Sequence, residues 1–239
     1  MPNPSRRSVS SATGPLVPVL LLCLLCLITP RAVGQEPAAP VTALGKQLDR
    51  IDFAISAAGI FGTKVSGIEQ RDAKTIDSLL TIKPSNTVGE LATLRYTPRP
   101  LIGFEFNFGN SRYTENFTFV PQPTPNILTG GAQSGVRELT LGYVAHTPKL
   151  FGIQPFLGAG GGTIRFKPTP YGGQGLQPQY RAAYYYDVGL EDNFPGSHFG
   201  ARLAFRQLIY LAPDFGQNYL TITRRTLTSE PTIGFFVRF

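Results

Sequence analysis

Two histidines, His146 and His198, are the residues of this sequence best suited to general acid–base catalysis. A histidine side chain exchanges a proton near neutral pH, so either could activate a nucleophile beside a bound substrate. The strands predicted below place His146 at the end of one strand and His198 at the start of another, both at the same rim of the fold. Histidines at such positions are usually interfacial or turn residues, and we expect neither to be a catalytic base.

Metal and phosphate chemistry has little support in the sequence. Cys23 and Cys26 lie in an apolar segment near the N-terminus, and no His, Asp and Glu residues gather at the spacing of metal ligands. Residues 160–162 are three consecutive glycines, but they lack the Lys-Ser/Thr ending of a phosphate-binding loop. We therefore expect no metal, no cofactor and no enzymatic activity.

Charged residues at alternate positions form a second group of interest. Alternate side chains of a β-strand point to opposite faces, so charges two residues apart share a face while apolar neighbours occupy the other. We expect these charges to meet in the lumen of a barrel and to pair, because a buried charge without a partner is costly. The predicted lumen charge network comprises Glu105, Glu138, Asp187, Glu191, Glu230, Arg202, Arg206 and Arg238, and we expect Arg95, Arg165 and Arg181 to join it.

Eight segments carry this alternation of apolar with small or polar residues, which is typical of strands. They span 51–62, 87–98, 101–112, 135–147, 154–166, 180–191, 198–210 and 227–239. The long connections are 63–86, 113–134, 167–179 and 211–226, and the short ones are 99–100, 148–153 and 192–197. Short periplasmic turns that alternate with longer, solvated and mobile extracellular loops are typical of transmembrane barrels. We predict an all-β fold, an eight-stranded antiparallel up-and-down transmembrane β-barrel.

The pattern also predicts which side chains face lipid. An arginine or lysine facing hydrocarbon at mid-membrane costs about 2–4 kcal/mol, so the charged parity of each strand must face the lumen. Lipid-facing rows predicted in this way include those through Phe53, Phe104, Leu139, Tyr184, Phe205 and Phe235. Two strands resist the assignment. In 87–98, Glu90 shares the parity of Leu94 and Tyr96, and in 154–166 the glycines at 158 and 160–162 give no facing signal.

The N-terminus reads as a secretory signal peptide, 1–34. Arg6 and Arg7 precede an apolar stretch of about thirteen residues, too short for a spanning helix, and small residues follow at 32–34, after which we expect cleavage. Residues 35–50 read as a periplasmic lead-in and 51–239 as the barrel. Loss of three arginines with the signal lowers the net charge from +7 to +4, too little to favour nucleic acid.

A soluble β-sandwich is the alternative fold, because it also has seven or more short strands separated by turns. A sandwich has no reason to sort its connections strictly into long and short ones. The alternation of connection lengths therefore favours the barrel.

Two motifs carry a resemblance to a known family. Residues 230–239 (EPTIGFFVRF) alternate apolar side chains and end in an aromatic one, and residues 155–162 (PFLGAGGG) begin the fifth strand. On these motifs the chain resembles the small outer-membrane barrels of the OmpA/OmpX type from about residue 51 to 239. The resemblance implies insertion by the outer-membrane assembly machinery, with Phe239, Val237, Phe235 and Ile233 as the assembly signal. It implies no ligand-binding residues.

The sequence favours a monomer in the bacterial outer membrane whose partners are membrane lipid and, during insertion, the assembly machinery. We expect a structural or surface-interaction role through the extracellular loops, with a lumen largely plugged by paired charges. The alternative is a narrow, porin-like conduit for ions or small solutes, or a barrel that binds an apolar ligand. An enzyme acting on outer-leaflet lipid is the rival class, but it would need its base in the extracellular half.

Overall fold

The structure is a computed structural model that describes residues 43–69, 78–121 and 126–239. A short helix, α2 (Ala43–Leu48), precedes ten strands. They are β1 (Ile51–Gly62), β2 (Val65–Ile68), β3 (Ser78–Pro84), β4 (Thr87–Arg99), β5 (Ile102–Pro121), β6 (Leu128–His146), β7 (Gln154–Pro168), β8 (Gln179–Asn193), β9 (Phe199–Leu211) and β10 (Arg225–Arg238), with a 3-10 helix η1 (Asn218–Leu220) before the last. The predicted signal peptide and residues 35–42 of the lead-in lie outside the described residues. No described helix is both long and apolar enough to span a membrane.

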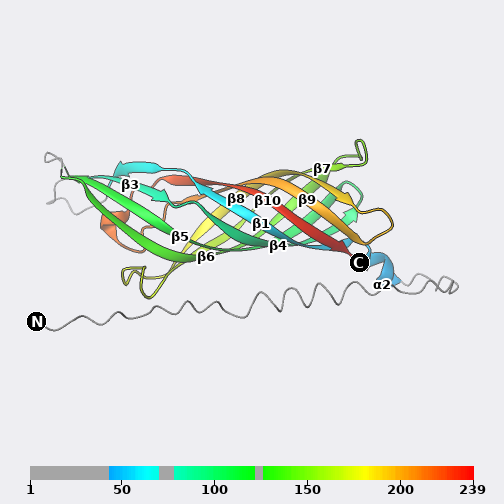
Figure 1. Ribbon diagram of the computed structural model, residues 1–239, viewed down its shortest axis with the longest axis horizontal. Helices are drawn as coiled ribbons and strands as arrows, with labels where there is room; N and C mark the ends of the chain where they lie inside the picture. Colours follow the sequence, from blue (N-terminus) through cyan, green and yellow to red (C-terminus); the bar gives the residue numbers. More distant parts are fainter. Residues whose placement is uncertain (1–42, 70–77, 122–125) are drawn as a thin grey trace, which may run out of the picture. The chain divides into compact units, whose positions relative to one another are not determined.

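Eight of the strands form a closed ring (Figure 1). Their order is β1-β4-β5-β6-β7-β8-β9-β10, every neighbouring pair is antiparallel, and β10 pairs again with β1, for example through Phe235 opposite Ile55. Because ring neighbours follow one another along the chain, the barrel is of the up-and-down kind. The predicted fold class is confirmed.

The other two strands extend the ring at one end. β2 pairs with β3 in the same register as β1 pairs with β4, so β2 continues β1 and β3 leads into β4. The prediction of a loop over 63–86 is therefore wrong for 65–68 and 78–84, which are strand. Leu80 and Ile82 are buried, whereas Leu79 before them is exposed and Thr81 between them is half-buried, which is the alternation of a strand with one packed face.

The hairpin of β5 and β6 also runs further than predicted. The ladder continues to Phe119 opposite Leu128, so most of the predicted loop 113–134 is strand. Its polar composition suggested a solvated loop, but Tyr113 and Phe117 point inward and are buried, whereas Asn116 is exposed. Residues 122–125, at the tip, lie outside the described residues.

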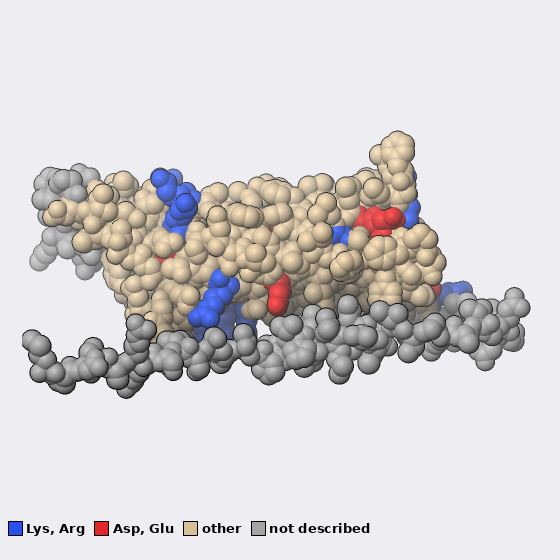
Figure 2. Space-filling view, in the orientation of Figure 1, with Lys and Arg blue, Asp and Glu red and all other residues tan. Residues whose placement is uncertain are grey.

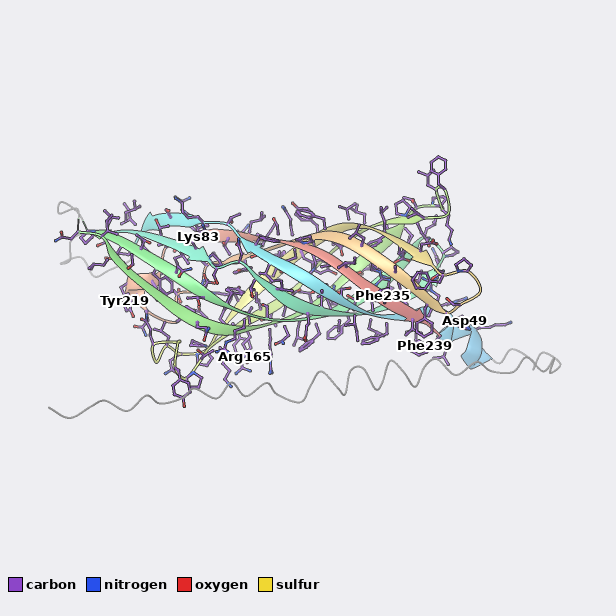
Figure 3. The ribbon with its side chains drawn as sticks, in the orientation of Figure 1. Asp49, Lys83, Arg165, Tyr219, Phe235 and Phe239 are labelled. Atoms are coloured by element: carbon purple, nitrogen blue, oxygen red, sulfur yellow. The ribbon has the colours of Figure 1, made fainter. Side chains whose placement is uncertain are left out.

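The two ends of the barrel differ. The turn end carries the short connections 100–101, 147–153 and 194–198, and the hairpin end carries the extended pairs β2–β3 and β5–β6 and the connections 169–178 and 212–224. Asp49 and Phe239 are labelled at the turn end in Figure 3, and Tyr219 is labelled at the hairpin end.

The outer wall is apolar while the interior near the turn end and the middle holds buried charges, which is the arrangement of a transmembrane barrel and not of a soluble protein. Large apolar side chains that are exposed on the wall form an apolar belt: Phe53, Ile55, Leu94, Phe104, Phe106, Phe108, Leu139, Leu141, Tyr143, Leu157, Tyr184, Tyr186, Val188, Leu190, Leu203, Phe205, Ile233 and Phe235. The wall is largely uncharged on the face shown in Figure 2. The rows predicted to face lipid are therefore the exposed ones.

The two strands without a clear facing are settled by burial. On β4, Arg95 is buried in the lumen and Glu90 is exposed on the outer wall. On β7, Phe156, Ile164 and Phe166 point inward, which places Arg165 on the outside. The prediction that Arg165 joins the lumen network is wrong, because the glycines of this strand carried no facing signal.

Candidate functional site

The lumen near the turn end holds seven ionisable side chains, here called the turn-end cluster: Asp52, Arg95, Glu105, His146, Glu191, Arg202 and Arg238. Arg95 on β4 lies at its centre and is 1% exposed. Its guanidinium donates hydrogen bonds of 2.8 Å to both Glu105 on β5 and Glu191 on β8. The ring of Phe156 lies 4.6 Å from the same guanidinium. Hydrogen bonds between ionised groups at this distance are stronger than hydrogen bonds between neutral groups.

Arg202 extends the cluster across the lumen. It donates to Glu191 at 3.0 Å and to Asp52 on β1 at 2.9 Å. Arg238, whose side chain is 32% exposed, lies 3.6 Å from Glu191 and 3.8 Å from Asp52. Three arginines thus face three carboxylates, and the formal charges of these six groups cancel.

A second, middle cluster comprises Glu138, Thr140, Arg206 and Glu230. One nitrogen of the Arg206 guanidinium donates to Glu138 and to Glu230, each at 2.9 Å, and the Thr140 hydroxyl donates to Glu138 at 2.8 Å. Arg206 is 1% exposed. Two carboxylates therefore depend on a single cation, unlike the balanced turn-end cluster.

Tyr185 on β8 connects the two clusters. Its hydroxyl donates to Glu105 at 2.8 Å, and its ring lies 4.3 Å from the Arg206 guanidinium. The ring has room because Gly142 and Gly160 face it, and a Cβ added at either position would collide with it. A glycine of β6 and a glycine of β7 thus make space for a side chain of β8.

The eight residues of the predicted lumen charge network point inward, but they divide into groups. Glu105, Glu191, Arg202 and Arg238 meet in the turn-end cluster, and Glu138, Arg206 and Glu230 meet in the middle cluster. Asp187 is buried beside Gly158 and makes no ion pair with a described residue. Asp52 was missing from the predicted network, although its parity on β1 places it in the lumen.

His146 and His198 both lie at the turn end, the rim at which the predicted strands placed them. His146, however, is not a turn residue. It is buried in the lumen, with Nε2 3.2 Å from Arg95 and 3.4 Å from Glu191. His198 is exposed, and its carbonyl accepts a hydrogen bond from the Arg238 amide. Next to the turn-end cluster, a cavity of about 260 Å³ is lined by residues that include Arg50, His146 and Glu191.

The hairpin end of the lumen is filled by apolar side chains, here called the apolar cap: Leu80, Ile82, Tyr113, Phe117, Phe166, Tyr210, Phe215, Leu220 and Ile222. Phe215, Leu220 and Ile222 come from the connection after β9, and the ring of Phe215 packs edge-on against Phe117 and Phe166. A space of about 20 Å³ between the cap and the middle cluster has room for a single water.

The prediction that 211–226 is a solvated loop is wrong for these residues. The segment is also tied down by polar contacts, since Arg181 forms an ion pair of 2.7 Å with Asp214. Burial alone would raise the pKa of Asp214, but hydrogen bonds from Gln179, Gly216 and Arg181 hold that pKa below its usual value. Arg181 points inward as predicted, yet it pairs with this connection and not with the lumen acids.

Glu115 is buried against the apolar cap, beyond the apolar belt. Its side chain is fully buried, and neither carboxylate oxygen has a hydrogen-bond partner among the described residues. Burial raises the pKa of Glu115 to about 8. The folded protein therefore holds a proton that the unfolded chain, with a glutamate pKa of about 4.3, releases.

This raised pKa predicts a pH-dependent stability. The stabilisation by the Glu115 proton is complete below about pH 4 and is lost as the pH rises to about 8. We expect Glu115→Gln to match the wild type near the lower pH and to be more stable at the upper one, by denaturant unfolding in detergent micelles. Glu90→Gln, at an exposed acid, is the control. Parallel pH profiles for the wild type and Glu115→Gln would contradict the prediction.

Among the described ranges, no group of three or more His, Cys, Asp or Glu side chains could hold a metal ion. No family model matches the sequence, and no curated protein matches it.

Solved structures that are similar to this chain include the following three. Neisserial surface protein A (NspA) is 10% identical, with 78% of this chain and 97% of that chain covered and a TM-score of 0.45. The outer membrane protein OprG from Pseudomonas aeruginosa is 16% identical, with 79% and 95% covered and a TM-score of 0.48. The outer membrane protein AlkL, determined in lipid bilayers, is 16% identical, with 87% and 97% covered and a TM-score of 0.44.

Proposed function

We propose that the protein is a bacterial outer-membrane barrel with a closed lumen, which acts through the surface that its hairpin end presents outside the cell. The observation that carries the proposal is the double closure of the lumen. The two charged clusters fill it from the turn end to the middle, and the apolar cap fills the rest. A solute would have to displace paired charges and packed aromatic rings, so the alternative of a conduit has less support.

The hairpin end supports the surface role. β5 and β6 remain paired far beyond the apolar belt, up to Phe119 and Leu128, and β3 pairs with β5 beside them. The inner face of this extension packs on the apolar cap, so the projecting sheet is held as part of the fold. A structured projection presents a fixed surface to a partner and loses little conformational entropy on binding.

The same proposal includes insertion of the barrel into the outer membrane by the assembly machinery. Ile233, Phe235 and Val237 lie in the outward row of β10, and Phe239 follows the strand with the same parity. The Phe239 amide donates to the Ile51 carbonyl at 3.3 Å. This row is exposed along the strand that closes the ring, where assembly machinery could read it. The orientation proposed puts the turn end in the periplasm, since outer-membrane barrels have short periplasmic turns.

Solute permeability separates the closed barrel from a conduit. We expect proteoliposomes with the wild-type protein to show no stepwise conductance and no swelling in small sugars, while a general porin in matched vesicles shows both. The heat-dependent gel mobility of the same sample establishes that the barrel is folded. Steady single-channel steps from the folded wild type would contradict the closed lumen and favour the conduit.

A further inference from the structure

Six outward-facing residues on β5, β6 and β7 form two neighbouring rows at the hairpin-end edge of the apolar belt. Asn110 lies opposite Arg137, which lies opposite Arg165; Arg112 lies opposite Gly135, which lies opposite Lys167. Four of the six are therefore cations, and we call the set the basic grid. Arg165 is labelled on the outer wall in Figure 3, and basic side chains are visible in the same part of Figure 2.

None of the cations of the basic grid forms an ion pair with an acid in the part of the chain that the structure describes, although the exposed Glu90 on β4 lies opposite Asn110 at one side of the grid. Arg112 donates to Gln133 at 2.7 Å, and the Arg165 guanidinium lies 5.3 Å from the Tyr180 ring, but neither they nor Arg137 and Lys167 form an ion pair there. In the lumen, by contrast, each arginine of the two clusters contacts a carboxylate.

This arrangement is unfavourable for the protein by itself. Arg137 and Arg165 are directly opposite on adjacent antiparallel strands, and like charges in that position repel one another. A counter-anion between them would remove the repulsion. Gly135, in the middle of the second row, has no side chain to fill that space, and a Cβ added there would meet only the Lys167 carbonyl oxygen at 3.9 Å.

The empty space is a recess of about 150 Å³, lined by Asn110, Gly135, Arg137, Arg165 and Lys167. The apolar belt begins next to it, because Phe108 and Leu139 precede and follow the grid on β5 and β6, and both are exposed. A ligand in the recess would have its anionic group among the cations and could lay a hydrocarbon chain along the belt.

We propose that the basic grid binds the phosphate groups of an anionic lipid in the leaflet at the hairpin end, with the lipid's acyl chains on Phe108, Leu139 and Leu141. Arginine guanidiniums bind phosphate through two parallel hydrogen bonds, and lysine adds a point charge. Four cations favour a lipid with more than one negative charge. The site lies on the outer wall and is independent of the closed lumen.

Native mass spectrometry of the folded protein, released from phosphatidylcholine nanodiscs that contain a little lipid A, tests the proposal. The wild type should retain diphosphorylated lipid A, and it should retain the monophosphorylated form, which has the same acyl chains, less well. Each basic residue near an anionic surface contributes roughly five-fold in affinity, so Arg137→Gln/Arg165→Gln/Lys167→Gln should bind about 100-fold more weakly.

Two further variants distinguish the contribution of the charges to lipid binding from that of the shape of the recess. Lys83→Gln/Arg224→Gln/Arg225→Gln removes the same charge from exposed residues outside the grid and should bind as the wild type does. Gly135→Leu keeps every charge but fills the recess, and it should lose binding. The proposal is overturned if the grid variant retains lipid A as the wild type does, or if inorganic phosphate displaces the lipid at equal concentration, which would mean a site for free anions.

Discussion

Replacement of Arg206 by methionine should lower the free energy of unfolding by about 3–5 kcal/mol, because two buried carboxylates lose the cation they share. Glu138 and Glu230 both accept hydrogen bonds of 2.9 Å from Arg206, whose side chain is 1% exposed. No other cation among the described residues forms an ion pair with either acid. Denaturant unfolding in detergent micelles measures the effect.

Arg238→Met is the matched control for this prediction. The Arg238 side chain is 32% exposed, and its nearest carboxylate oxygens are 3.6 Å and 3.8 Å away, so its loss should cost less than about 1 kcal/mol. Adding Glu138→Gln and Glu230→Gln to Arg206→Met should recover much of the lost stability, since no unpaired charge remains in that cluster. Equal losses for Arg206→Met and Arg238→Met would show that the middle cluster is not held by ion pairing.

Gly160→Ala should prevent the barrel from folding, whereas Gly161→Ala should be tolerated. A Cβ at residue 160 would collide with the Leu141 carbonyl oxygen and lie 2.6 Å from Gly142 Cα and 2.7 Å from the Tyr185 ring. Backbone atoms of β6 cannot give way without breaking the ladder between β6 and β7. A Cβ at residue 161, on the outer wall, would lie 3.2 Å from the Tyr184 ring and 3.3 Å from a carbonyl oxygen, which small shifts accommodate.

The two alanine variants differ by one position and by nothing in chemistry, so only the facing of β7 separates them. The measurement is the fraction of each protein that migrates as the compact, heat-sensitive form after refolding. We expect almost none of it for Gly160→Ala, but for Gly161→Ala a yield close to that of the wild type and a stability change within about 1 kcal/mol. Comparable yields of the two variants would contradict the inward assignment of Gly160 and the space it leaves for Tyr185.

The barrel could be predicted from the sequence because apolar residues alternate with charged or small ones in most of the strands whose outer face meets lipid. On β9, Leu203 and Phe205 face outward and Arg202 and Arg206 face inward, as the parity requires. The strand extensions were missed for a physical reason. Beyond the belt the outer face is polar, so Thr114 and Asn116 resemble loop residues although Tyr113 and Phe117 still pack inward.

Parity shows which residues enter the lumen but not the height at which they meet. That height depends on the stagger between strands, which the sequence pattern does not contain. Asp52 and Arg202, for example, are 150 residues apart in the chain and come together only because of the registers of β1, β10 and β9. The division into two clusters and the missed pairing of Asp52 follow from this limit. The wrong facing of Arg165 has a different cause, because the glycines of β7 carry no facing signal.

The seam between β1 and β10 has a consequence for folding. The hairpin of β5 and β6 joins neighbouring segments and can form early, whereas the seam joins the first strand of the ring to the last. Contacts between such distant residues form slowly. Until β10 has docked, both β1 and β9 present open edges that can pair with another chain and aggregate. The protein therefore avoids aggregation only if the open edges of β1 and β9 stay shielded until β10 pairs with both strands.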